Sequence, residues 1–311
     1  MSAKENNSKM ATELLSLGYK KVWFDEFEPR ERVDVNQWSF QPYMRGFADL
    51  EISNSLDVAR IVTDEQGNSF LRLTSHACGI NEDGVRCYAT TKSLTTGVNM
   101  TYTYGYLEIR AKVPTGRGVW PSFWLKSFDH MKHSEDIGKQ LHYEFDSEVK
   151  AEVDVFEVFG NNRVISNIHK WWVPGSKLQK EYVEAGKSPQ NEYITEYRVG
   201  FYELNDNDWH TYGFLWNETE ISMYVDDELI YTYDLTKNFG AEQDSVDMSV
   251  FHKPLCIIFN NHLYTEGMPS YLVPVRNGVR ENVMPDFVSA DYDIDYIRLY
   301  QNENGKIYFA E

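Results

Sequence analysis

Alternation of apolar and polar residues with a period of two is the recurrent pattern along the chain. It is clearest in residues 105–113 (GYLEIRAKV), where apolar Leu107 and Ile109 alternate with charged Glu108 and Arg110. Successive side chains of a β-strand point to opposite faces, so this segment is predicted to be a strand with one apolar and one solvent-facing side.

The same pattern recurs often enough to predict the fold class. Comparable segments lie at residues 21–27, 69–75, 151–159, 163–172, 209–217, 221–234 and 293–301. The segment 221–234 predicts a hairpin that turns near Asp226 and Asp227. Only residues 10–17 (MATELLSL), stopped by Gly18, are helical in pattern. Strands with so few helices predict an all-β antiparallel sandwich or jelly roll and disfavour βαβ crossovers and a parallel sheet.

The length of 311 residues fits one large β-sandwich domain, and no linker divides the chain. We expect residues 1–20 to form an N-terminal extension with a short helix, and residues 21–311 to form a single domain. Two polar stretches, 127–150 and 173–198, are longer than tight turns require. They are either loops that shape a site or tolerated surface insertions.

Charge and hydropathy limit the partners. There are 48 acidic and 30 basic residues, a formal charge of −18, and no basic patch that would attract nucleic acid or an anionic membrane. No run of 18 apolar residues predicts a membrane span, and the polar start MSAKENNSKM lacks the apolar core of a secretory signal. A chain whose signal had been removed would look the same.

Three cysteines, Cys78, Cys87 and Cys256, lack CxxC spacing, which argues against a disulfide framework and a zinc site. Cys78 and Cys87 could pair, but we favour three isolated, mostly buried thiols.

Residues 151–160 (AEVDVFEVFG) combine strand alternation with three carboxylates. Glu152 and Asp154 share one face of the predicted strand. Glu157 lies at an odd offset, which would direct it into the core, where an unpaired carboxylate costs several kcal/mol. A β-bulge at Val155–Phe156 would return Glu157 to the acidic face, and bulges are frequent beside active sites.

This arrangement predicts a division of labour. Glu152 and Glu157 would lie four strand steps apart, roughly 13 Å between Cα atoms, and their carboxyls could lean to within about 5.5 Å, the spacing of a retaining glycosidase. Three such carboxyls cannot all ionise cheaply, so we expect Asp154 to share a proton with a neighbour and to raise at least one pKa. A protonated Glu157 and an ionised Glu152 would supply a general acid and a nucleophile. A solvated acidic face or a calcium site is the alternative.

Several motifs in order resemble glycoside hydrolase family 16, a family of laminarinase-, lichenase- and agarase-like enzymes. Its members share a G-Y-x-E-x-R-x-K-x-P strand, a W-P-x-x-W-L segment and an E-x-D-x-x-E bulged strand. These match GYLEIRAKVPTGRGVWPSFWLKS (105–127) and EVDVFEVFG (152–160). WFDEF (23–27), HTYGFLWNETEISMYVDDE (210–228) and DIDYIRLYQ (293–301) fit further family strands. The likeness spans roughly residues 21–301.

The resemblance implies a jelly-roll β-sandwich of two antiparallel sheets with a glycan groove across the concave face. Glu152 would match the nucleophile, Asp154 the assisting carboxylate and Glu157 the acid/base of a double displacement that retains configuration. No cofactor is needed for that reaction.

Aromatic and polar residues near these motifs are candidates for substrate contact, because sugar rings stack on indoles. The candidates are Trp120, Trp124, His169, Trp171, Trp172 and Arg45. We expect one tryptophan of each close pair to pack in the core; the resemblance assigns Trp120 to the cleft and leaves Trp124 leaning to the core. His169 would hydrogen-bond the nucleophile or a sugar hydroxyl, or simply be satisfied by its neighbours.

Many family members hold a calcium ion on the convex side. The resemblance implies Glu26, Gly67 and Asp295 as its ligands here, although Asp295 could equally cap a turn.

The resulting hypothesis is an endo-acting, retaining hydrolase of a β-linked polysaccharide, monomeric, and secreted, periplasmic or at the cell surface as the resemblance implies. The substrate is a β-1,3 or mixed-linkage glucan, or a galactan of agar, porphyran or mucin type. The enlarged 127–150 segment and residues 254–267 (PLCIIFNNHLYTEG) depart from the pattern of β-1,3-glucan cleavers. A transglycosylase and a non-catalytic glycan-binding jelly roll are the alternatives.

Overall fold

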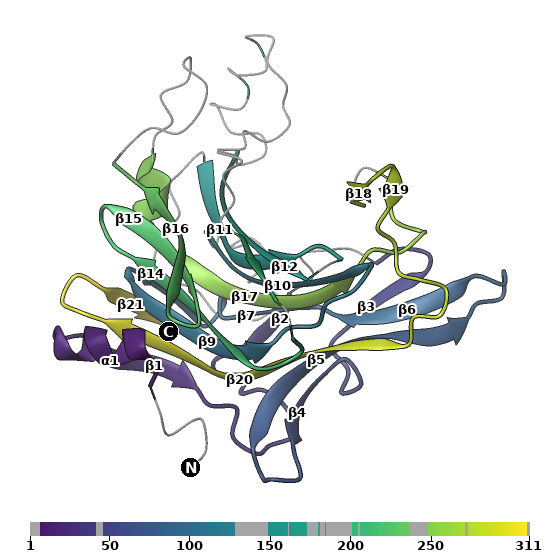
Figure 1. Cartoon of the computed structure of the whole chain (residues 1–311), viewed down its shortest axis with the longest axis horizontal. Helices are drawn as coiled ribbons and strands as arrows, with labels where there is room; N and C mark the ends of the chain where they lie inside the picture. Colours follow the sequence, from purple (N-terminus) through teal and green to yellow (C-terminus); the bar gives the residue numbers. More distant parts are fainter. Residues whose placement is uncertain are drawn as a thin grey trace.

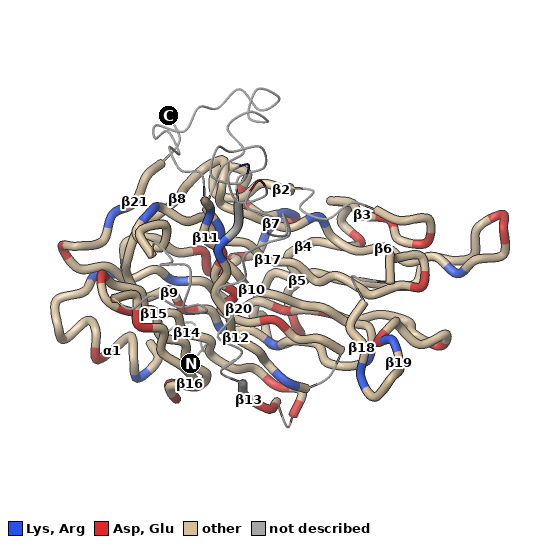
Figure 2. The backbone as a smooth tube through the Cα atoms, turned by 90° about the horizontal axis from the view of Figure 1, so that it is seen from above, with Lys and Arg blue, Asp and Glu red and all other residues tan. Residues whose placement is uncertain are grey.

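The fold is a sandwich of two large curved sheets packed face to face (Figure 1). The computed structural model describes residues 7–41, 46–127, 149–160, 162–172, 180, 184, 201–204, 206–236, 248–270 and 273–309. Most of these residues are in strands, so the all-β prediction is confirmed. Acidic and basic positions are interspersed over both sheets (Figure 2).

The larger sheet has ten strands in the described part of the chain. They are β1 (Lys20–Asp25), β3 (Leu50–Ser53), β4 (Ala59–Thr63), β5 (Ser69–Ile80), β6 (Arg86–Thr91), β9 (Gly105–Lys112), β14 (His210–Trp216), β15 (Glu220–Val225), β16 (Glu228–Asp234) and β20 (Ser289–Gln301). Their order is β16-β15-β14-β9-β20-β5-β6-β3, with β1 beside β20 and β4 beside β5. β3 and β6 pair in parallel, unlike the antiparallel pairs around them.

The smaller sheet has nine strands within the same described residues. They are β2 (Ser39–Gln41), β7 (Ser93–Thr95), β8 (Met100–Thr103), β10 (Val119–Ser127), β11 (Val149–Val158), β12 (Arg163–Trp172), β13 (Phe201–Glu203), β17 (Leu255–Leu263) and β21 (Lys306–Phe309). The order β13-β12-β11-β10-β17-β7-β2 places β10, β11, β12 and β17 side by side. In Figure 1 these four strands curve above β20 and β5, and the short hairpin of β18 (Val275–Arg276) and β19 (Val279–Arg280) rises at one end.

The core lies between the two sheets. Alternate side chains of the central strands enter it, for example Phe123 of β10, Val153 of β11 and Phe259 of β17, all fully buried. The rings of Phe123 and Phe259 stack at 5.0 Å between centroids. Burial of this apolar surface is the main term that holds the sheets together, and it leaves the alternate residues on the opposite face of the smaller sheet.

Helix α1 (Lys9–Ser16) confirms the helix predicted at residues 10–17. Ser8 caps its N-terminus by accepting a hydrogen bond from the Ala11 N–H. Gly18 follows with φ +93°, in the left-handed region that favours glycine after a helix end. A short 3₁₀ helix, η3 (Met248–His252), precedes β17. Among the described residues, no helix is long and apolar enough to cross a bilayer.

The β15–β16 hairpin turns at Asp226 and Asp227, as the sequence predicted. Their φ values are +49° and +66°, the left-handed conformation that a tight hairpin turn requires. The Asp227 carboxylate also accepts hydrogen bonds from the Lys9 N–H (3.1 Å) and the Met10 N–H (2.8 Å), so the hairpin caps helix α1.

Replacement of Asp227 by glycine is therefore expected to loosen helix α1. Glycine accepts the left-handed conformation, so the variant removes only the capping carboxylate, and amide hydrogens of α1 should exchange about 5-fold faster, as for the loss of a typical cap. Hydrogen exchange followed by mass spectrometry measures this. Asp227→Asn keeps an acceptor oxygen and should stay closer to wild type; equal exchange in wild type and Asp227→Gly would contradict the capping role.

Glu108 corrects the prediction that β9 has one solvent-facing side. It is 0% exposed, and its carboxyl accepts hydrogen bonds from the hydroxyls of Tyr106, Tyr296 and Ser8. Burial raises the pKa of this carboxyl. Helix α1 packs against this face of the ten-stranded sheet, as the cluster of Leu14 with Tyr106 shows. The alternation of β9 is real, but its polar side is covered at Glu108, whereas Arg110 and Lys112 farther along the strand are half-buried.

The three cysteines are free thiols, as favoured from the sequence. Only Cys256 is buried, whereas Cys78 is exposed and Cys87 half-buried, so the expectation of mostly buried thiols is wrong. Cys78 lies where the register between β5 and β6 shifts, near the turn that connects these two strands.

Candidate active site

The predicted acidic strand is β11, which lies between β10 and β12 in the smaller sheet. Up to Asp154, its odd-numbered residues enter the core and its even-numbered residues face the concave side. On β10 the concave side carries Trp120, Ser122, Trp124 and Lys126, because Phe123 and Leu125 are in the core.

The predicted β-bulge is present. Trp124 of β10 pairs with Asp154, but the adjacent Phe123 pairs with Phe156, so Val155 is the extra residue. Val155 and Phe156 both pack into the core, and Glu157 returns to the half-buried side. The pairing with β12 shifts at the same place. The physical reason is the one anticipated: without the bulge, a carboxylate would be buried among apolar side chains.

The register also bears on the spacing of the two glutamates. Glu152 lies opposite Lys126 and Glu157 opposite Ser122, four positions apart on β10. This corresponds to roughly 13 Å between Cα atoms along a strand. The carboxyl separation of about 5.5 Å that a retaining glycosidase uses stays a prediction.

Glu157 has the surroundings of a general acid. The indole Nε1–H of Trp120 donates a hydrogen bond of 2.9 Å to its Oε1. Burial raises the pKa of the Glu157 carboxyl well above its usual value, the charge of Asp154 raises it further, and the Trp120 hydrogen bond opposes both. The carboxyl therefore favours its protonated form and can donate a proton.

Glu152 has a cation beside it. The Lys126 Nζ lies 3.4 Å from its Oε2, and the Glu152 side chain is 14% exposed. Burial raises the pKa of this carboxyl too, and the charge of Asp154 raises it further. The Lys126 ammonium and His169 act in the opposite direction and lower it. Unlike Glu157, whose partner Trp120 is neutral, Glu152 thus has a cationic partner that favours its ionised form.

Asp154 pairs with His169, its neighbour on β12. The His169 Nε2 lies 2.9 Å from the Asp154 Oδ2, and the residues are 8% and 4% exposed. Burial lowers the pKa of His169, but the hydrogen bond and charge of Asp154, with the charge of Glu152, outweigh burial and raise it overall. Single ligand atoms of Glu152, Asp154 and His169 lie within 4.8 Å of one another.

This pairing refines the expectation that His169 hydrogen-bonds the nucleophile candidate. In register His169 lies opposite Glu152, and Asp154 lies opposite Asn167. The imidazole reaches diagonally to the next same-face position, which long side chains on neighbouring strands can do.

Trp120 is enclosed by other rings. Its ring stacks on Tyr264 at 4.8 Å between centroids with an interplanar angle of 9°, and lies 5.9 Å from His262 and 6.0 Å from Phe159. It is half-buried on the concave side, as the cleft assignment expects. Its most specific contact is the hydrogen bond to Glu157 rather than an open ring face.

Trp124 corrects the expectation that it leans to the core. It is half-buried on the concave side, and its Nε1–H donates to the Asn260 Oδ1 at 2.8 Å. The Lys126 Nζ lies 5.5 Å from its ring centroid. Trp120 and Trp124 are four residues apart on one strand, an even offset, so both indoles face the same side.

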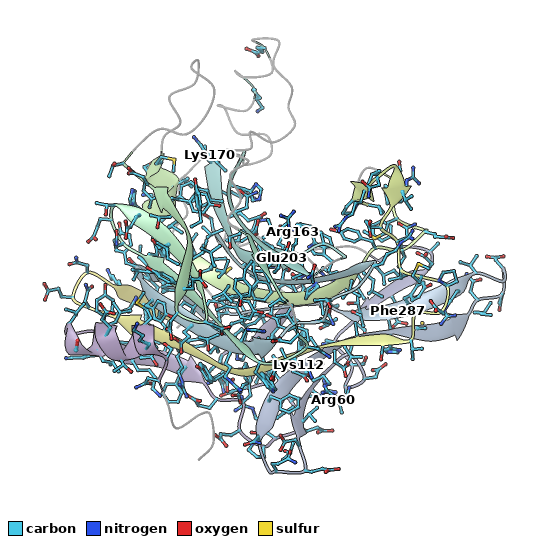
Figure 3. The ribbon with its side chains drawn as sticks, viewed as in Figure 1. Arg60, Lys112, Arg163, Lys170, Glu203 and Phe287 are labelled. Atoms are coloured by element: carbon cyan, nitrogen blue, oxygen red, sulfur yellow. The ribbon has the colours of Figure 1, made fainter. Side chains whose placement is uncertain are left out.

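Several predicted positions lie outside the described residues. Arg45 is among them, as are most of the two polar stretches, 127–150 and 173–198. The backbone of Trp171 and Trp172 belongs to β12, but their side chains are not described. At the other end of β12, Arg163 and Glu203 lie together above the sheet, 4.0 Å apart (Figure 3).

The two carboxylates expected to hold calcium do not fit that role. The two oxygens of Glu26 accept a bidentate pair of hydrogen bonds, both 2.8 Å, from Arg298, and Asp295 accepts one of 2.7 Å from Arg110. Gly67 lies in the turn between β4 and β5, with its N–H bonded to the Asp64 carbonyl. Carboxylates already neutralised by guanidinium groups are poor ligands for a cation, so we assign no metal here.

The sequence prediction did not include three residues that contact the candidate site residues: Lys126, Asn260 and Tyr264. Lys126 could have been found, because it continues the even spacing of Trp120 and Trp124 along one strand face. Asn260 and Tyr264 are brought in by β17 and the residue after it, far away in the sequence, and no local pattern signals them.

Relatives match the chain in sequence along most of its length. A beta-glucanase of Rhodothermus marinus is 26% identical over 285 residues, which cover 91% of this chain and 85% of the relative. The glucan endo-1,3-beta-glucosidase A1 of Niallia circulans is 23% identical over 297 residues, covering 92% of this chain but 38% of the relative.

A solved structure of an endo-acting O-glycanase, from work on mucin breakdown by members of the human gut microbiota, superimposes with a TM-score of 0.61. The two chains are 22% identical, and the superposition covers 92% of each of them. That level of identity supports the shared fold.

The family assignment comes from a match to the pattern of a whole family. Residues 59–253, well over half of the chain, match the family described as glycosyl hydrolases family 16. This range contains β11 and its bulge. The chain therefore belongs to glycosyl hydrolases family 16 and is an O-glycosyl hydrolase.

Proposed function

We propose that the chain cleaves internal bonds of a β-linked polysaccharide with retention of configuration, using Glu152 as nucleophile, Glu157 as acid/base and Asp154 as the assisting carboxylate. The observation that carries this proposal is the bulge of β11, which returns Glu157 to the side of the sheet that holds Glu152. Two carboxyls with different surroundings on one face meet the requirement of a double displacement.

The surroundings of each carboxyl suit its step. Glu157, kept protonated by burial and by the charge of Asp154, gives its proton to the glycosidic oxygen as the bond to the anomeric carbon breaks. Glu152, whose ionised form Lys126 favours, forms a covalent bond to that carbon. Glu157, now ionised, takes a proton from water, whose oxygen displaces Glu152 and regenerates both groups.

Asp154 is placed to couple these steps. Its charge raises the pKa of both glutamates, and its hydrogen bond with His169 fixes its orientation. When Glu157 loses its proton in the first step, Glu152 loses its charge by forming the glycosyl bond, so the total charge near Asp154 is nearly constant. Such charge balance avoids the cost of a second buried anion.

The activities of similar proteins narrow the proposed substrate to two groups of glycans. The similarity to a beta-glucanase and to a glucan endo-1,3-beta-glucosidase favours a β-1,3 or mixed-linkage glucan. The similarity in fold to a mucin-directed O-glycanase keeps a galactan or mucin-type chain as the second group. Trp124, half-buried on the concave side, offers the indole on which a pyranose ring would stack.

The test is a panel of laminarin, lichenan, agarose, porphyran, carrageenan and mucin glycans, with products sized over time and the first-formed anomer read by NMR. Oligosaccharides of intermediate length that appear first in the β configuration are expected. Initial α products would contradict retention, and release of monosaccharides alone would contradict internal cleavage. Binding of a glycan without any cleavage would support a lectin-like role instead.

A further inference from the structure

The Trp120 indole is the direct hydrogen-bond partner of the proposed acid, and its position depends on a loop from another part of the chain. The ring of Tyr264, which directly follows β17, lies parallel to the indole at 4.8 Å and 9°. Tyr264 is 1% exposed, and both of its backbone groups are bonded, its N–H to Gly118 and its carbonyl to Val283.

A buried carboxylate anchors this loop. Asp49 is 3% exposed, and its two oxygens accept 2.8 Å hydrogen bonds from the Thr265 hydroxyl and from the Gly267 N–H. A side chain at position 267 would collide with the Asp49 carboxyl, so the close approach requires glycine. The backbone carbonyl of Asp49 in turn accepts a hydrogen bond from the Tyr88 N–H of β6, which fixes Asp49 to the larger sheet.

The loop, the indole and the acid form one connected set. Tyr264 and Met268 pack in a cluster that includes Trp120 and Phe159. A stacked ring restrains the plane of the indole, and that plane determines whether the Nε1–H points at the Glu157 oxygen. Asp49 is bonded to β6 of the larger sheet, and Thr265 lies just after β17 of the smaller sheet. The hydrogen bond between them therefore couples the two sheets near the active site.

We propose that Tyr264 and Asp49 are positioning residues for Glu157, acting through the ring and the indole N–H of Trp120. The inference rests on the proposed acid/base role of Glu157. A hydrogen bond to a carboxylate stabilises its ionised form, so a misplaced indole leaves Glu157 a weaker acid. Loss of this positioning should slow the steps that need a proton donor and have little effect on the steps that do not.

The test compares Tyr264→Leu with Tyr264→Phe, which keeps the stacked ring. In Tyr264→Leu the alkaline limb of the kcat/KM profile should move up by on the order of 1 pH unit, the value of one hydrogen bond to a charged group. Its kcat/KM should fall about 10-fold on the polysaccharide but little on an aryl glycoside whose leaving group needs no proton. Tyr264→Phe should restore the wild-type profile.

Trp120→Phe supplies the second arm. It removes the N–H but keeps an aromatic ring, and should shift the alkaline limb as Tyr264→Leu does. If Tyr264 acts through Trp120, the double variant should shift no further than Trp120→Phe alone. Asp49→Asn, which leaves one of the two loop hydrogen bonds without an acceptor, should give a smaller shift in the same direction.

Three results would overturn the inference: an unshifted profile in Tyr264→Leu, equal losses on both substrates, or additive effects in the double variant. Thermal unfolding of each variant shows that the comparison uses folded protein. If Glu157→Ala retained full activity, the proposed function itself would fail; if that variant is inactive and Tyr264→Leu unshifted, only the positioning role fails.

Discussion

Glu152→Gln is expected to reduce turnover by a factor on the order of 10⁴ to 10⁶, the range seen when a catalytic nucleophile is removed. The amide keeps the size of the side chain but cannot form the glycosyl bond. It also removes the negative charge that lies 3.4 Å from the Lys126 ammonium in the wild type. Glycan binding should survive, because the indoles and the concave sheet are unchanged.

Reducing-sugar release measures the turnover of Glu152→Gln, and isothermal titration with the oligosaccharide identified by the panel measures its binding. Glu228→Gln is the matched control, since Glu228 is exposed on β16 in the other sheet. Undiminished product release by Glu152→Gln would refute the nucleophile assignment. Loss of binding together with turnover would instead indicate a collapsed site.

Strands with one buried and one exposed face were predictable, because burial then leaves a period of two in the sequence. β12, predicted at residues 163–172, has those bounds in the structure. β17 was not predicted as a strand, although it lies near the middle of the smaller sheet. All nine of its residues are buried, so its sequence carries no alternation.

The acidic strand shows what local patterns can reach. Glu157 was predicted to return through a bulge because its odd offset conflicted with burial, and the register confirms that argument. The side on which Trp124 lies could also have been predicted, because its offset from Trp120 is even. The expectation that Trp124 leans to the core was wrong because the two tryptophans were treated like adjacent residues.

Contacts between distant segments were beyond this reasoning. Nothing near Asp49 in the sequence indicates that it anchors the Tyr264 loop, since the contact exists only once both sheets have formed. Glu108 likewise looks solvent-facing until helix α1 covers it. Patterns along the chain therefore predicted which residues share a face, and tertiary packing decided what lies over that face.

The pH profile of the wild type should report the two glutamates. The proposed double displacement requires Glu152 ionised and Glu157 protonated, so kcat/KM should rise as pH increases through the pKa of Glu152 and fall as it increases through that of Glu157. Both pKa values are raised above the usual 4.5, Glu157 much further. The bell should therefore be displaced upward in pH, with its alkaline limb assigned to Glu157.

Glu157→Ala should remove that alkaline limb and lower kcat/KM on the polysaccharide by about 10² to 10⁴, the usual contribution of a general acid. With an aryl glycoside whose leaving group needs no proton, the glycosyl-enzyme still forms, but its hydrolysis is slow because no general base activates water. Azide, which attacks without one, should then raise turnover and yield the β-glycosyl azide. An α-azide would indicate a single displacement, and no rescue with an intact alkaline limb would mean that another residue is the acid/base.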